Sequence, residues 1–147
     1  MNPYQNILCP VAFSSSCELA AKRAAELAGR YQARLTLLHV IDHFPEDFLN
    51  EWIAPDNAEP EEYLRLQTRK KLASLAACVE MPEVEQVVRF TTFSVRHEIV
   101  LYAKEVGVDL VVMGSHTGQG LLSTLGSTAA AISHTAPCDT LLVRATG

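Results

Sequence analysis

Short apolar runs alternate with longer amphipathic segments along the chain, and this alternation restricts the possible folds more than any other feature. We expect strands at 6–11, 35–40, 85–90, 109–113 and 140–144. Segments with helical spacing lie between them, at 19–29, 61–79, 94–106 and 127–135. Strands that alternate with helices predict right-handed crossovers and a parallel sheet covered on both faces.

The helices are predicted from apolar positions that recur with a period of 3.6 residues. The first helix is expected to be capped by the serines at 14–16 and to end near Gly29. In the first helix this period is kept by Leu19, Ala20, Arg23, Ala24, Leu27 and Ala28. In the next two helices, Leu64, Lys71, Leu72, Leu75 and Ala76 lie near one face, and Ile99, Ala103 and Val106 are expected to point inward.

Length and charge narrow the class of protein. The 147 residues suit one domain, 1–147, and the 48% hydrophobic and 20% charged content is that of an ordinary globular domain. The net charge of −5 argues against binding to a nucleic-acid backbone, which requires a basic surface. The one basic cluster, at 69–71, is interpreted as a solvated helix face. No secretion signal or membrane span is expected.

The four cysteines show neither a CxxC pair nor zinc-ligand spacing. Cys9, Cys17, Cys78 and Cys138 lie in apolar or helical contexts, which predicts reduced, packed thiols. Reduced thiols are typical of the cytosol.

An acidic segment from Asp42 to Glu62 interrupts the alternating pattern. It carries eight carboxylates and no lysine or arginine. Apolar residues at helical spacing follow Pro45, so we expect a short amphipathic helix lying on the sheet or on a partner. The spacing of the carboxylates does not support a metal site.

A loop rich in glycine follows the fourth predicted strand, in the sequence VVMGSHTGQGLLSTLGST at 111–128. Bare backbone that leads into a helix N-terminus is typical of phosphate binding. No lysine follows a glycine, which excludes the P-loop pattern, and the GxGxxG fingerprint is also absent. From the residues alone, a phosphate cradle and a tight turn with a capped helix both stay open, with Ser127 as cap or ligand.

The whole chain resembles the universal stress protein family, and its last thirty or so residues are the most specific part of the match. The matching stretches are ILCPVAFSSS, RLTLLHVID, VDLVVMGSH, GS before a helix, and APCDTLLVR. The resemblance implies a Rossmann-like α/β fold, a five-stranded parallel sheet ordered 3-2-1-4-5 with helices on both faces. The spacing within the glycine loop resembles a short-loop subgroup of the family.

The resemblance also implies a nucleotide site. Gly114 and the pair Gly126-Ser127, followed by Thr128, match the ends of the family's glycine pattern, while Thr117 replaces its second glycine and Gly118 lies one position further on. Pro10, Val40 and His116 stand at positions that match the family's pocket and loop. Ala12 replaces an aspartate that helps to bind the nucleoside, and Phe93 replaces a glycine after the third strand.

The histidines do not indicate catalysis. His39 is interpreted as a packed structural group, and His43, His97 and His134 as surface residues. The glycine loop contains no lysine or arginine to stabilise phosphate charge, and no nucleophile elbow is present. We therefore expect a protein that is not an enzyme.

Two functions stay open at this point. The first is a cytoplasmic stress-response regulator with a weakened or vestigial site for ATP or AMP, with magnesium. The second is a protein-interaction module of the same fold that binds no nucleotide. The resemblance implies a homodimer through the last strand, Thr140 to Arg144, and an unidentified protein partner, with no nucleic acid and no membrane.

Overall fold

The computed structural model describes residues 4–13, 17–42, 60–81, 83–115 and 124–144, with the backbone alone at 60, 115 and 124–128. These residues form a parallel sheet of order β3-β2-β1-β4-β5. In chain order the elements are β1 (Asn6–Pro10), α1 (Cys17–Tyr31), β2 (Arg34–Asp42), α3 (Pro60–Cys78), β3 (Val84–Thr91), α4 (Val95–Val106), β4 (Leu110–Ser115), α5 (Thr124–Thr135) and β5 (Asp139–Arg144).

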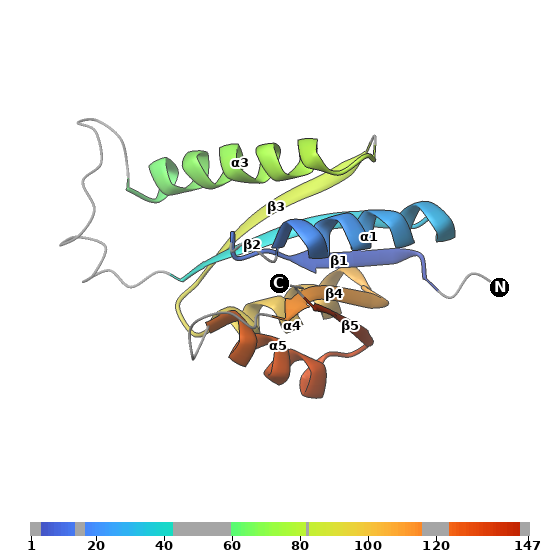
Figure 1. The fold of residues 1–147 in the computed structure, drawn as a ribbon. Helices are drawn as coiled ribbons and strands as arrows, with labels where there is room; N and C mark the ends of the chain where they lie inside the picture. The colour runs from blue at the N-terminus through green and yellow to red at the C-terminus, as the bar shows by residue number, and fades with distance from the viewer. Residues whose placement is uncertain (1–3, 14–16, 43–59, 82, 116–123, 145–147) are drawn as a thin grey trace.

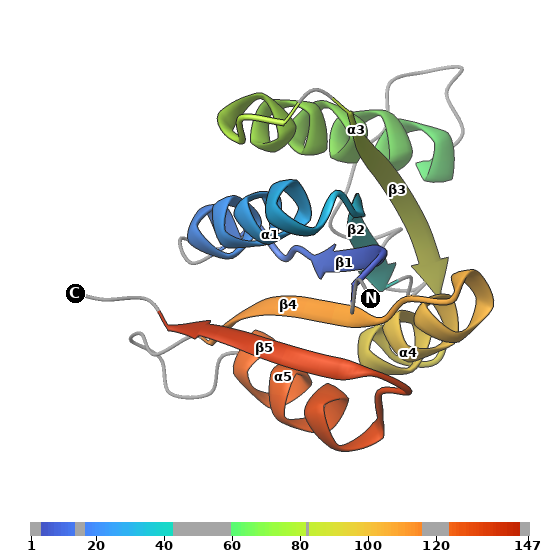
Figure 2. The same ribbon diagram turned by 90° about the vertical axis from the view of Figure 1, so that its right-hand side faces the viewer.

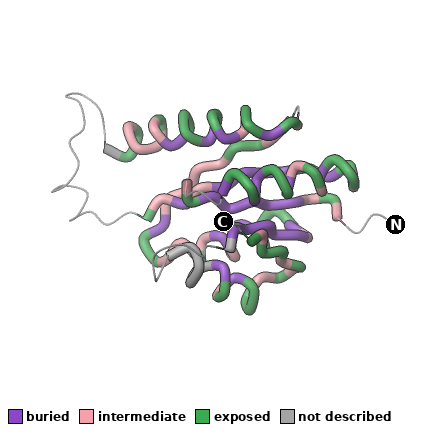
Figure 3. The backbone as a smooth tube through the Cα atoms, viewed as in Figure 1, coloured by how far each residue is buried: buried purple, intermediate pink, exposed green. Residues whose placement is uncertain are grey.

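Helices cover both faces of the sheet. α1 and α3 lie on one face, and α4 and α5 lie on the other (Figure 1). Side chains of β1 alternate between two cores, with Ile7 and Cys9 packed beneath α1 and Leu8 packed with Ile99 and Ile132 on the other face. The central strands are buried on both sides (Figure 3), which is why their sequences are continuous apolar runs. The predicted fold class and strand order are confirmed.

The buried face of α1 consists of small residues rather than leucines. Cys17, Ala20, Ala21, Ala24 and Ala28 are buried, and alanines let the helix axis approach the sheet closely. Leu19 and Arg23 keep the helical period of this segment but do not lie on its buried face. Leu19 is 45% exposed, and the Arg23 guanidinium lies 3.4 Å from the Glu26 carboxylate in solvent.

The inward faces of the next two helices were predicted more accurately. Leu72 and Leu75 of α3 and Ile99 and Ala103 of α4 are buried. Lys71 is exposed, as its charge requires. Val106 was also predicted inward but is 42% exposed, because α4 ends there and the chain turns away at Gly107.

The remaining sequence expectations have mixed outcomes. Cys9 and Cys17 are buried and belong to no disulfide, whereas Cys78 is exposed and Cys138 half-buried, so the prediction of packed thiols fails at Cys78. The basic side chains at 69–71 are solvent-exposed, as predicted. The amphipathic helix predicted after Pro45 lies outside the described residues. Within the described part of the chain, no helix is both long and apolar enough to cross a bilayer.

Candidate nucleotide site

The carboxyl ends of β1 and β4 meet at the centre of the sheet, where the chain changes direction. β1 pairs with β2 on one side and with β4 on the other (Figure 2). In open α/β sheets this switch point is where ligands bind. Pro10 at the end of β1, Val40 near the end of β2 and Gly114 near the end of β4 are all buried at this edge.

The structure brings together only part of the predicted site. Pro10, Ala12, Val40 and Gly114 lie at the carboxyl ends of the three central strands. His116, Thr117 and Gly118 lie outside the described residues. Gly126, Ser127 and Thr128 belong to α5, where the structure describes the backbone alone.

Helix α5 begins earlier than the sequence predicted. Its first residue is Thr124, so Ser127 lies inside the helix and the prediction of Ser127 as a helix cap was wrong. The unpaired amides of a helix belong to its first turn, which here covers Thr124 to Gly126. A phosphate group would bind to these amides, because they carry the positive end of the helix dipole.

Ala12 lies two residues past the end of β1, at the edge of the sheet where the candidate site is placed. Strand pairing continues just past β1, because the Val11 amide donates a hydrogen bond of 2.8 Å to the Leu38 carbonyl. Ala12 follows and is exposed, and Phe13 then adopts the left-handed region with φ of 58°. The methyl group of Ala12 offers a nucleoside no hydrogen bond and no charge.

A cluster that the sequence interpretation missed lies beside this mouth. The Phe13 ring packs against the His39 ring, with centroids 4.6 Å apart, and the Lys71 ammonium lies 5.5 Å from the Phe13 centroid. His39 Nδ1 is 2.7 Å from the Val11 carbonyl oxygen, which can only accept, so Nδ1 carries the proton. Burial lowers the pKa of His39, and the Lys71 charge lowers it further, although the hydrogen bond to Val11 acts in the opposite direction.

His39 is therefore the packed structural group that the sequence predicted. His97 and His134 are exposed, again as predicted, and His43 lies outside the described residues. The thiol of Cys9 lies in β1 next to the site, but burial raises its pKa to about 12, so it stays protonated at neutral pH.

Phe93 lies two residues past the end of β3, in the turn that leads into α4. Phe93 is 73% exposed. Its ring contacts the His97 ring of α4 edge to face, with the ring centroids 4.9 Å apart. The bulk that replaces the family's glycine is thus directed toward α4.

The described part of the site holds no catalytic constellation. No group of three or more metal-ligating side chains occurs among the described residues. The sequence between Gly114 and Thr128 contains no lysine or arginine. Phosphoryl transfer relies on cations around the phosphates, and the side chains of this stretch supply none.

The fold defines an open α/β domain with a five-stranded parallel sheet, and comparison with known proteins identifies its family. Residues 3–144 match the model of the universal stress protein family, and the chain belongs to that family. Universal stress protein A homolog 1 of Coxiella burnetii is 35% identical over 95% of this chain and 96% of its own length. Universal stress protein G of Escherichia coli O157:H7 is 31% identical over 96% of this chain and 99% of its own length.

A solved structure agrees with this assignment. The universal stress protein UspA from Lactobacillus plantarum superposes with a TM-score of 0.69 and is 27% identical, covering 96% of this chain and 98% of its own. The two chains thus share the fold over nearly their full length.

Proposed function

We propose that this chain is a cytoplasmic stress-response regulator that acts as a homodimer and has a weakened site for an adenine nucleotide. The observation that carries the proposal is the contrast between two parts of one crevice. Gly114 and the first turn of α5 keep the features of a phosphate site, whereas Ala12 removes a charged partner of the nucleoside.

Two structures of the same fold support an adenine nucleotide as the ligand class. A universal stress protein solved in complex with cAMP has a TM-score of 0.68 to this chain at 23% identity. The universal stress protein from Archaeoglobus fulgidus, solved in complex with dAMP, also has a TM-score of 0.68, at 18% identity. At these identities the likeness concerns the fold, so the assignment of the ligand to this chain depends on its own residues.

The magnitude of the Ala12 effect follows from hydrogen-bond energetics. A hydrogen bond to a charged group contributes about 1.5–3 kcal/mol, so its loss weakens binding roughly ten- to a hundredfold. The buried Pro10 and Val40 still offer an apolar surface for a base, which is consistent with retained but weak affinity.

The experiment is a calorimetric titration with ATP and AMP in the presence of magnesium. We expect affinity weaker than micromolar for the native chain and a gain of roughly ten- to a hundredfold for Ala12→Asp. Ala73→Asp is the matched control, because Ala73 is exposed on α3 and the same charge there should leave affinity unchanged.

The outcomes distinguish the two functions. Micromolar or tighter binding by the native chain would contradict the weakened site. If Ala12→Asp gains no affinity and the native chain shows no heat at millimolar nucleotide, the crevice is not a nucleotide site. A protein-interaction module is then the better description.

The homodimer is common to both functions, and the edge strand β5 supports it. β5 is an edge strand with apolar side chains, and Leu141 and Leu142 are 36% and 43% exposed. The opposite edge strand, β3, presents the charged or polar Glu85 and Gln86 instead. An apolar edge strand favours pairing with another strand, so we propose β5, Thr140 to Arg144, as the homodimer interface.

A further inference from the structure

A groove runs between the first turns of α4 and the second half of α5, on the face of the molecule opposite α1. Its volume is about 450 Å³. The residues that matter for its chemistry are Phe93, Arg96, His97, Val100, Ala131 and Thr135. None of them belongs to the candidate nucleotide site, and we name this feature the α4–α5 groove.

Phe93 is presented to solvent by an ordered turn. Its backbone amide donates a hydrogen bond of 3.1 Å to the hydroxyl of Thr91, which is itself only 5% exposed. Ser94 caps α4 by accepting from the His97 amide at 3.1 Å, and the His97 ring supports the Phe93 ring from one side. A phenyl ring that is held in place and yet 73% exposed loses little entropy on binding, so it is suited to contact a partner.

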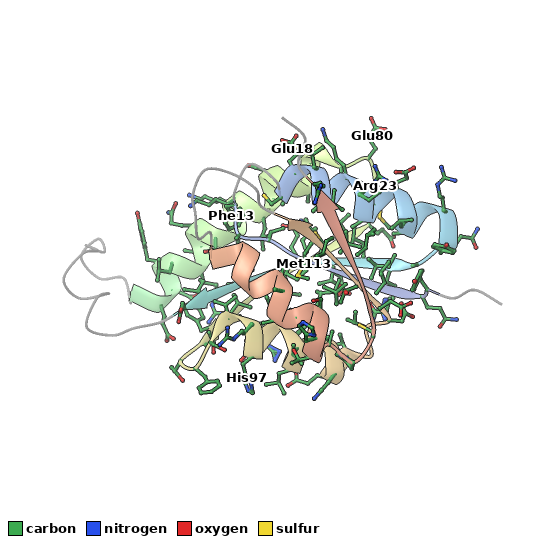
Figure 4. The ribbon with its side chains drawn as sticks, turned by 60° about the horizontal axis from the view of Figure 1, so that its bottom comes forward. Phe13, Glu18, Arg23, Glu80, His97 and Met113 are labelled. Atoms are coloured by element: carbon green, nitrogen blue, oxygen red, sulfur yellow. The ribbon has the colours of Figure 1, made fainter. Side chains whose placement is uncertain are left out.

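The charge of the α4–α5 groove is positive, although the chain as a whole is acidic. Arg96 is exposed and makes no ion pair within the part of the chain that the structure describes. The nearest carboxylate along the helix, Glu98, is directed inward, with its Oε2 atom 3.3 Å from Arg89 Nε. None of the described residues that line the groove is acidic, and the N-terminus of α4 adds its dipole to the charge of Arg96. In Figure 4, His97 projects from α4 at the margin of the molecule, away from Phe13 and the candidate site.

We propose that the α4–α5 groove docks an acidic peptide segment of a partner protein, with one aromatic or large aliphatic side chain as its anchor. The anchor packs against Phe93, Val100 and Ala131, and the flanking carboxylates pair with Arg96. An exposed aromatic residue beside an arginine is the typical composition of an interface hot spot. A single arginine supplies too few phosphate contacts for a nucleic acid.

The experiment is a selection from a random peptide library on the immobilised full-length protein. We expect the enriched peptides to share an aromatic or large aliphatic residue flanked by aspartate or glutamate. A fluorescein-labelled copy of the enriched peptide is then titrated against variants and read by anisotropy. Phe93→Ser and Arg96→Glu should each weaken its binding at least tenfold, and higher salt should weaken it further.

Two controls match these substitutions on the other face of the sheet. Leu66→Ser removes a comparably exposed apolar side chain from α3, and Arg30→Glu reverses an exposed charge on α1. Both should leave binding of the peptide unchanged. Circular dichroism and the midpoint of thermal unfolding confirm that each variant is folded.

Three results would overturn the proposal. One is a library that yields no common sequence, and another is a common sequence whose binding is indifferent to Phe93 and Arg96. The third is displacement of the labelled peptide by ATP with the same dependence on Phe93 and Arg96, which would make the groove a small-anion site instead.

Discussion

The carbonyl oxygen of Val11 lies 2.7 Å from Nδ1 of His39, and this contact joins the end of β1 to β2 beside the mouth of the candidate site. The proton on Nδ1 is held by a carbonyl that cannot donate, so the neutral ring keeps one tautomer. The ring also packs against Phe13, whose φ of 58° is unusual for a residue with a β-carbon. His39 thus supports the turn that presents Ala12 to the crevice.

Stability should fall in mildly acidic solution because of His39. Its pKa is lowered in the folded state, mainly by burial, so below about pH 6.5 the unfolded chain binds a proton that the folded chain resists. The contribution of the neutral ring is present above the unfolded pKa and is lost as the pH falls below it. His39→Asn keeps a donor near the Nδ1 position but does not titrate, so its unfolding free energy should fall less between pH 7.5 and 5.5. Urea unfolding measures both, and equal losses would contradict the assignment.

A second prediction concerns the ion pairs that fasten α4 to β3. The Arg89 guanidinium lies 3.3 Å from the Glu98 carboxylate and 2.8 Å from the Glu105 carboxylate. Its central carbon, Cζ, lies 5.1 Å from the centroid of the Tyr102 ring. The Arg89 side chain is 26% exposed and that of Glu98 is 14% exposed, so these charges are only partly screened. Arg89→Leu leaves Glu98 without its partner and should cost about 2–3 kcal/mol, somewhat less than for a fully buried pair.

The expected loss of stability on removing Arg89 is larger than the loss expected for an exposed surface ion pair. Replacing Arg89 and Glu98 together by leucine should recover much of the loss, because the largely buried carboxylate of Glu98 is then no longer left unpaired, while the Glu105 side chain is 46% exposed and is solvated by water. Arg30→Ala is the control, since its pair with Glu26 is largely exposed and should be worth less than about 1 kcal/mol. The unfolding free energy in urea measures all three, and an equal loss for Arg89→Leu and Arg30→Ala would contradict the interpretation.

The parallel sheet could be predicted from the sequence. Strands buried on both faces are continuous apolar runs, and Val111, Val112 and Met113 are all fully buried. Their alternation with helices predicts a parallel sheet, while the order of the strands came from the family resemblance. With the order known, the carboxyl ends of β1 and β4 follow as the ligand edge.

The side-chain environment could not be predicted in the same way. Periodicity identifies a stripe on a helix but does not say which part of the stripe meets the sheet. Leu19 and Ala20 both keep the period, yet Ala20 is buried and Leu19 is 45% exposed. The contacts of Phe13 with His39 and Lys71 join three elements that are distant along the chain. No local pattern encodes such contacts. The start of α5 at Thr124 was missed because Ser127, a residue type that favours helix caps, indicated a start three residues too late.

Replacing two glycines by alanine should change the free energy of unfolding in opposite directions, because their backbone conformations differ. Gly107 caps α4 in the left-handed region, with φ of 70°, and its amide donates to the Ala103 carbonyl. Nothing lies within 4 Å of a β-carbon built there, so the cost of Gly107→Ala is conformational, about 1–2 kcal/mol. Gly29 lies inside α1, also with open space around it, and Gly29→Ala should stabilise the protein by about 0.8–1 kcal/mol. Thermal unfolding measures both, and a shared sign would contradict the assigned conformations.

The proposed homodimer through β5 predicts a clear response to a charge on that strand. Leu142 is 43% exposed on the outer edge of the sheet, and lysine is a residue with which natural edge strands prevent pairing. Leu142→Lys should therefore convert a dimer into a monomer at micromolar concentration without loss of helical signal in circular dichroism. Leu66→Lys introduces the same charge at a 53% exposed position on α3 and should stay dimeric. Sedimentation velocity measures the oligomeric state of the native chain and of both variants. A monomeric native chain would contradict an interface on β5, and so would a Leu142→Lys chain that stays dimeric.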